Sequence, residues 1–122
     1  MKLVCLALGG ALGTLSRYWL SGAIHESAGP GFPLGTLAVN ALGCLAAGFL
    51  ATFHTSHQMV PEVRLLFTVG FCGAFTTFST LILETGYLYK GGQFWPAVLN
   101  IVLSVLAGSL ALLAGAWLGK QL

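Results

Sequence analysis

Polar side chains recur at helical spacing inside long apolar stretches of this sequence. One stretch carries Thr36, Asn40 and Gly43, and a later one carries Asn100 and Ser104. Residues three or four apart share one face of a helix, so each set forms a polar stripe. Such stripes suit a narrow polar path between tightly packed helices. The alternative is that the amide of Asn40 or Asn100 only bonds a neighbouring helix.

The apolar stretch around residues 70–81 contains two glycines and a run of threonine and serine near its centre. These are poor helix formers, so we expect a break or unwound turn around Gly73 to Thr77. Irregular backbone at membrane depth persists only where protein or a cavity covers it. Carbonyl groups freed there would be able to coordinate a small cation. The alternative is a kinked helix whose hydroxyl groups bond its own backbone.

Two faces follow the expected break. The polar face joins Thr77, Thr80 and Glu84 at i, i+3 and i+7. The neighbouring face is mainly aromatic and apolar, with Phe75, Phe78, Leu81 and Thr85. The positive edge of an aromatic ring can contact an anion and attracts it less strongly than a cationic side chain does. The alternative is that these phenylalanines pack against lipid or against other helices.

The composition places most of the chain in lipid. Hydrophobic residues make up 57% of the 122 residues and charged residues only 7%, against about a quarter in soluble domains. The few basic residues form no patch, which argues against a nucleic-acid partner. The three cysteines lie in apolar runs without disulfide or metal-ligand spacing. No catalytic constellation is present, so we do not expect an enzyme.

Four stretches are long enough to cross a bilayer, which needs about 20 apolar residues as helix. Backbone groups in lipid must bond internally, so we predict an all-α membrane protein. The expected spans form a single domain over residues 1–122: 3–24, 34–53, 63–89 and 94–118.

The charges around these spans give only a weak preference for one orientation. An even number of spans places both termini on one side. That side carries Lys2, Arg64 and Lys120, and the other carries Lys90, with Arg17 if it faces the first loop. Because basic residues in short loops set orientation, this chain can insert either way, which permits an antiparallel dimer.

Four short helices are few to enclose a polar path, so we expect a homo-oligomer. Glycines four residues apart offer surfaces for close helix packing. Two such pairs give mild support for oligomerisation: Gly9 with Gly13, and Gly115 with Gly119.

Four sequence blocks, one in each predicted span, occur at residues 9–18, 33–40, 70–80 and 100–104. The third, Gly-Phe-Cys-Gly-Ala-Phe-Thr-Thr-Phe-Ser-Thr, is the most specific. In content and order the blocks resemble the Fluc (CrcB) family of fluoride channels. The resemblance implies passive export of fluoride across the inner (cytoplasmic) membrane. It also implies an antiparallel, dual-topology homodimer with two pathways.

The resemblance further implies roles for particular residues. The fluoride pathway would include Asn40, Phe78, Ser79, Thr80, Ser104, Glu84 and Arg17. The ring edge of Phe78 would contact fluoride, and backbone carbonyls of Gly73 and Thr76 from both subunits would hold a structural sodium ion. One departure is Leu81, which stands where the family usually has a second phenylalanine, so an aromatic edge is missing from the pathway.

Two other functions fit parts of the pattern. Small multidrug-resistance-type proton-coupled transporters also have four helices and dual topology, but they resemble one another in using a carboxylate in the first helix. Here the only carboxylate inside a span is Glu84, in the third. A non-conducting assembly factor would use polar stripes only to join helices, and stripes on three spans exceed that need. No Lys or Arg lies in the middle of a span, which favours passage of an anion over storage.

Overall fold

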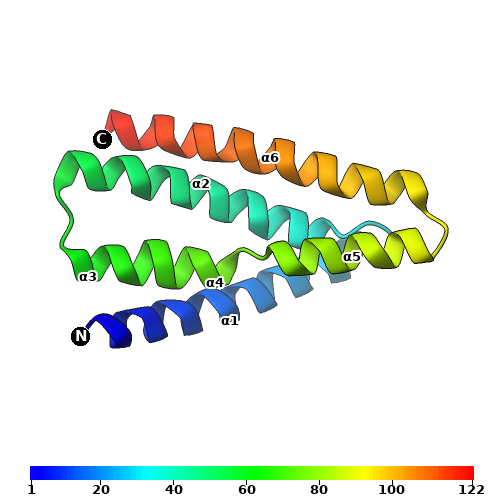
Figure 1. Ribbon diagram of the computed structural model, residues 1–122, viewed down its shortest axis with the longest axis horizontal. Helices are drawn as coiled ribbons and strands as arrows, with labels where there is room; N and C mark the ends of the chain where they lie inside the picture. Colours follow the sequence, from blue (N-terminus) through cyan, green and yellow to red (C-terminus); the bar gives the residue numbers. More distant parts are fainter.

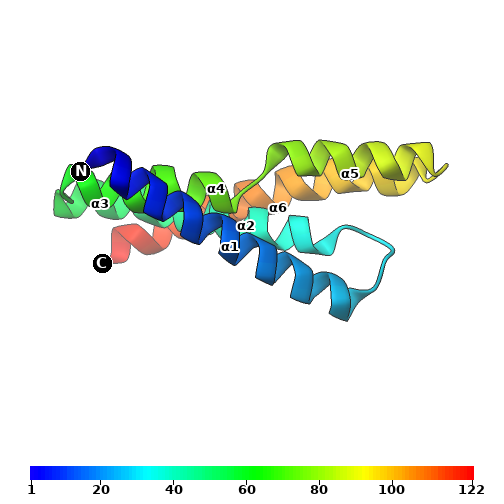
Figure 2. The same ribbon diagram turned by 90° about the horizontal axis from the view of Figure 1, so that it is seen from below.

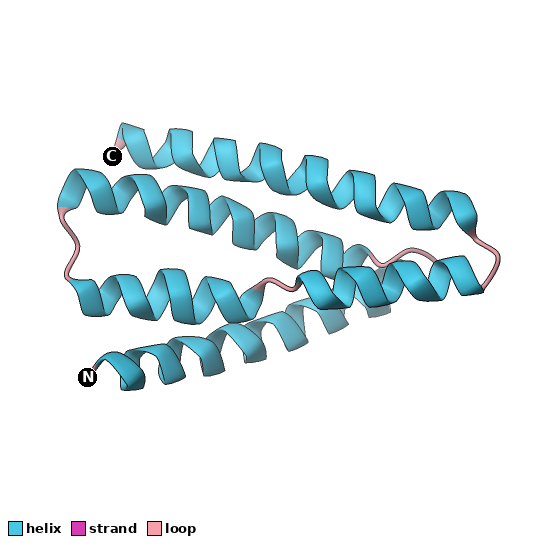
Figure 3. Ribbon diagram, viewed as in Figure 1, coloured by secondary structure: helices cyan, strands magenta, loops and turns pink.

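The computed structural model describes residues 1–122, and its only regular structure is helical (Figure 3). Four helical segments are long and apolar enough to cross a membrane: α1 (Lys2–Ala28), α2 (Leu34–His57), a third segment (Pro61–Lys90) and α6 (Phe94–Gln121). Each extends a few residues beyond the predicted span. The chain is therefore an all-helical protein with four helices capable of spanning a bilayer.

The third segment is composite. It contains α3 (Pro61–Arg64), the π-helix η1 (Leu65–Cys72), α4 (Gly73–Phe75) and α5 (Phe78–Lys90). Between α4 and α5 the ribbon narrows to a short connection (Figure 1).

Extended backbone within the third segment is confined to two residues. Thr76 has φ −86° and ψ 154°, and Thr77 has φ −150° and ψ 114°. β-branched side chains favour this conformation over a helix. Gly73 is helical, with φ −63° and ψ −34°. The irregular turn expected from Gly73 to Thr77 thus begins later than the glycine content indicates, because glycine permits unusual backbone without requiring it.

The helices pack in two closely associated pairs. α2 runs along α6, and α1 lies against η1 and α4. Both chain termini lie at one end of the bundle (Figures 1 and 2). At the other end α1 and α5 diverge beside the loop 29–33 (Figure 2).

Glycine allows backbone-to-backbone contact in both pairs. A Cβ atom on Gly9 would overlap the carbonyl oxygen of Leu66 in η1, and one on Gly13 would overlap that of Phe71. In the other pair, a Cβ atom on Gly115 would overlap the Leu45 carbonyl oxygen of α2. In lipid, helix association depends on such close van der Waals contact.

These contacts correct the expectation that the glycine pairs support oligomerisation. Gly9 and Gly13 face η1 and α4 of the same chain. Gly115 and Gly119 face α2 of the same chain. Both pairs are used in folding the single subunit, so any contact between subunits must use other surfaces.

Alanine at Gly9 is expected to destabilise the protein, whereas alanine at Gly10 is not. A Cβ atom on Gly10 has no neighbour within 4 Å, while one on Gly9 meets fixed backbone. Overpacking of this kind costs about 1–3 kcal/mol. Thermal unfolding of the two purified variants in the same detergent measures the difference, and equal midpoints for Gly9→Ala and Gly10→Ala would contradict the packing argument.

Candidate functional site

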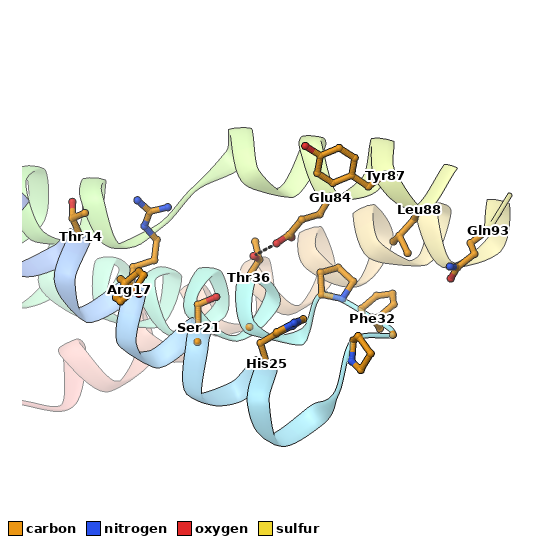
Figure 4. A pocket seen from close by; sticks show the side chains of 16 residues that line it. Thr14, Arg17, Ser21, His25, Phe32, Thr36, Glu84, Tyr87, Leu88 and Gln93 are labelled. Atoms are coloured by element: carbon orange, nitrogen blue, oxygen red, sulfur yellow. Dashed lines mark hydrogen bonds between the residues drawn. The ribbon is translucent and has the colours of Figure 1, made fainter. Parts of the chain in front are cut away.

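A cavity of about 730 Å³ opens at the end of the bundle beside the loop 29–33. We call it the mouth cavity. Its charged and polar lining includes Arg17 and His25 on α1, Thr36 on α2 and Glu84 on α5 (Figure 4). The cavity therefore collects ionisable side chains where α1 and α5 diverge.

Glu84 is held in the mouth cavity by α2. The Thr36 hydroxyl donates to Glu84 Oε1 at 2.7 Å (Figure 4), and Glu84 Oε2 is buried without a partner. Arg17 Nε is likewise buried without a partner. The bond between Thr36 and Glu84 was not predicted, although both residues belong to predicted polar stripes.

A second cavity, of about 430 Å³, lies at the extended residues of the third segment. We call it the central cavity. It brings together six of the predicted site residues: Asn40, Gly73, Thr76, Phe78, Leu81 and Ser104. Its lining contains no charged side chain. Polar groups at this depth are thus provided by amide, hydroxyl, thiol and backbone atoms.

The Asn40 amide bonds both backbone groups of Thr77. Asn40 Oδ1 accepts from the Thr77 N–H at 2.7 Å, and Asn40 Nδ2 donates to the Thr77 carbonyl oxygen at 3.1 Å. Extended backbone inside a helix has no helical partner, and the side chain supplies one. Asn40 therefore lines the cavity and bonds a neighbouring segment at once, and one Nδ2 hydrogen remains for another acceptor.

Thr77 caps the start of α5. Its hydroxyl oxygen accepts from the Thr80 N–H at 3.2 Å and its hydroxyl donates to Thr80 Oγ1 at 3.0 Å. Threonine directly before a helix is a known N-cap residue, and this preference was the overlooked sequence signal. Ser79 is exposed, and neither Ser79 nor Thr80 lines either cavity of the single chain.

The aromatic residues near the central cavity separate into different environments. Phe78 begins α5 and is 75% exposed, whereas Leu81 is 5% exposed. Phe75 is buried and stacks on Phe71 with ring centroids 5.4 Å apart. Phe75 does not line the central cavity, so Phe78 is its one aromatic lining residue.

The two polar residues of α6 have different surroundings. Ser104 is 8% exposed, lines the central cavity and has no partner for its hydroxyl oxygen. Asn100 is 0% exposed, and its Nδ2 donates to Thr85 Oγ1 at 2.9 Å. Of the two roles open for Asn100, the bond between helices is the one observed.

The four apolar helices, the uncharged cavity beside the extended backbone and the charged mouth cavity define a small multi-pass membrane protein. A protein family described as "CrcB-like protein, Camphor Resistance (CrcB)" matches residues 4–116, and the chain belongs to this family.

Similar proteins cover almost the whole chain. One from Desulforapulum autotrophicum, named "Fluoride-specific ion channel FluC", is 49% identical over 120 residues, covering 98% of this chain and 96% of its own length. Proteins of the same name from Bacteroides fragilis and Dehalococcoides mccartyi are 42% and 43% identical. They cover 98% and 99% of this chain, and 97% and 94% of their own lengths.

Proposed function

We propose that this chain is a subunit of a fluoride-selective channel that lets fluoride leave the cytoplasm passively through the inner membrane. The observation that carries the proposal is the central cavity, which offers hydrogen-bond donors and no fixed charge. The relatives named as fluoride-specific channels support it over their nearly full-length alignments. Export by this route lowers cytoplasmic fluoride without an energy source other than its own gradient.

Dehydration is the main obstacle for fluoride, a small and strongly hydrated anion. Donors must replace its water while holding it weakly enough to release it. The Ser104 hydroxyl, which has no partner, and the remaining Nδ2 hydrogen of Asn40 are available for this. The ring edge of Phe78 adds a weak positive surface. A lysine or arginine in the same place would bind the anion too tightly for rapid passage.

The mouth cavity would collect fluoride before dehydration. A cation in a cleft raises the local concentration of anions, and Arg17 supplies that charge. Glu84, held by Thr36, stands on the opposite wall (Figure 4) and would limit how strongly an anion is retained. Ser79 and Thr80 would join the pathway where a second subunit covers α5.

We propose an antiparallel homodimer of dual topology as the conducting unit. The exposure of Phe78, at the edge of the central cavity, supports a second subunit as its cover. The near balance of basic residues at the two ends supports insertion in both orientations. The extended turn of the third segment would then contribute to two pathways, one on each side of the dimer axis.

A structural sodium ion held by the Gly73 and Thr76 carbonyls of both subunits is part of this proposal. Both residues line the central cavity, and carbonyls at the end of a helix lack helical partners. Hard cations prefer oxygen ligands, and unwound helices coordinate Na⁺ in transporters. The residues present therefore fit the ion, which would join the two subunits at membrane depth.

Fluoride efflux from liposomes that contain the purified protein tests the function. We expect fast fluoride loss with little chloride loss, and strong reduction by Phe78→Ile and by Asn40→Asp, which places a charge in the central cavity. An absence of fluoride loss from well-inserted protein would reject the channel. The function to measure would then be coupled exchange of protons and drugs through Glu84, as in small multidrug-resistance-type transporters.

A further inference from the structure

Two backbone carbonyls of the third segment lack their helical donors, which bond side chains instead. In an α-helix each carbonyl accepts from the N–H four residues later. The donor for Gly73 is the Thr77 N–H, which instead donates to Asn40 Oδ1 at 2.7 Å. The donor for Thr76 is the Thr80 N–H, which instead donates to Thr77 Oγ1 at 3.2 Å. The extended backbone at Thr76 and Thr77 directs both N–H groups away from these carbonyls, and one identifiable side chain holds each N–H group there.

We propose that Asn40 and Thr77 are positioning residues, which keep the cation site open by bonding the Thr77 and Thr80 N–H groups and so stabilising the extended turn that leaves the Gly73 and Thr76 carbonyls free. Neither side chain contacts the cation itself. The inference rests on the sodium ion of the proposed function, and it assigns Asn40 a second role besides lining the fluoride pathway.

The electrostatics of the central cavity favour a cation at the two free carbonyls. A carbonyl without a donor is costly at membrane depth, and a bound cation offsets that cost. The free carbonyls also lie at the carboxyl end of the helical run that ends at Phe75, where the backbone dipoles point their negative ends. Asn40 bonds the Thr77 carbonyl as well as the Thr77 N–H, and that N–H belongs to the same peptide group as the Thr76 carbonyl, so Asn40 fixes the orientation of this ligand.

The response of thermal stability to sodium measures the site directly. Anything that binds the folded protein raises its unfolding temperature, so purified full-length protein is unfolded at increasing Na⁺ with N-methylglucamine as the balancing cation. We expect Asn40→Ala and Thr77→Val each to weaken sodium binding roughly 10–100-fold, as is typical when groups that orient metal ligands are removed.

Two variants serve as controls. Thr77→Ser keeps a hydroxyl that can accept from the Thr80 N–H, and it should restore the sodium response that Thr77→Val loses. Thr55→Val removes a helix-surface hydroxyl bonded only to nearby carbonyls of α2, and its response should equal that of the unaltered protein. An undiminished sodium response in folded Asn40→Ala and Thr77→Val would overturn the inference.

The unaltered protein provides a test that needs no substitution. An isotope-edited infrared band from a ¹³C=¹⁸O label on the Gly73 carbonyl should shift when N-methylglucamine replaces Na⁺, and a label on Ala111 in α6 should not. An unchanged Gly73 band would overturn the inference even if every variant fails to fold. Fluoride efflux without any sodium response would reject the cation site alone, whereas a sodium response without efflux would reject only the channel function.

Discussion

Replacing Gly43 with alanine is expected to reduce fluoride efflux about tenfold or more while the protein still folds. A Cβ atom on Gly43 would overlap the Cγ2 methyl of Thr76 and approach Phe75 Cδ1 at 3.2 Å. The Thr76 side chain is not free to rotate away, since its hydroxyl donates to the Cys72 carbonyl oxygen at 2.9 Å. The added methyl group would therefore displace the Thr76 side chain, which lines the central cavity. A barrier to fluoride passage raised by about 1.4 kcal/mol slows the rate tenfold.

A size-compensating substitution distinguishes this mechanism from general damage. Thr76→Ser removes the Cγ2 methyl and keeps the hydroxyl, so Gly43→Ala combined with Thr76→Ser should recover most of the lost efflux. Gly86→Ala is the matched control, because a Cβ atom there has no neighbour within 4 Å. Efflux from Gly43→Ala at the unaltered rate would show that contact between α2 and the extended turn does not set the pathway.

The largest loss of folded protein is expected from leucine at Gly115. A Cβ atom at this position overlaps the Leu45 carbonyl oxygen and would lie 2.9 Å from Phe49 N. These are backbone atoms of α2 that cannot move without separating α2 from α6. Leucine adds three further carbon atoms, so we expect little monodisperse protein by size-exclusion chromatography and a strongly lowered unfolding temperature.

Leucine at the neighbouring Ala114 provides the matched control. Ala114 is exposed on α6, so the larger side chain meets lipid and should leave yield and unfolding temperature nearly unchanged. If Gly115→Leu accumulated and unfolded like Ala114→Leu, the contact between α2 and α6 would not be the main support of the subunit.

Helical content and the residues of the central cavity were largely predictable from the sequence. Both follow from local rules: apolar length predicts a span, and spacing of three or four residues predicts a shared face. The stripe containing Asn40 and the one containing Ser104 do reach the same cavity. Even so, spacing alone did not decide whether Asn40 lines a polar path or bonds a neighbouring helix. Spacing shows which residues share a face of one helix, but not which segment that face contacts.

Other features depend on which helices become neighbours, and sequence patterns carry no such information. Glycine pairs look alike whether they meet the same chain or another one, so Gly9 and Gly115 were interpreted as possible subunit contacts. The capture of the Thr77 N–H by Asn40 joins residues 37 positions apart. The π-helix η1 likewise has no local signature, since it differs from an α-helix only in its hydrogen bonding.

The common end of the two termini has a practical consequence for measuring orientation in cells. A reporter protein fused to Met1 and one fused to Leu122 emerge on the same side of any one molecule (Figure 1). A population inserted in a single orientation would therefore activate one type of compartment-specific reporter at both positions. A population inserted both ways would activate the inside and the outside reporter from either position, and the ratio of the two signals counts the molecules in each orientation.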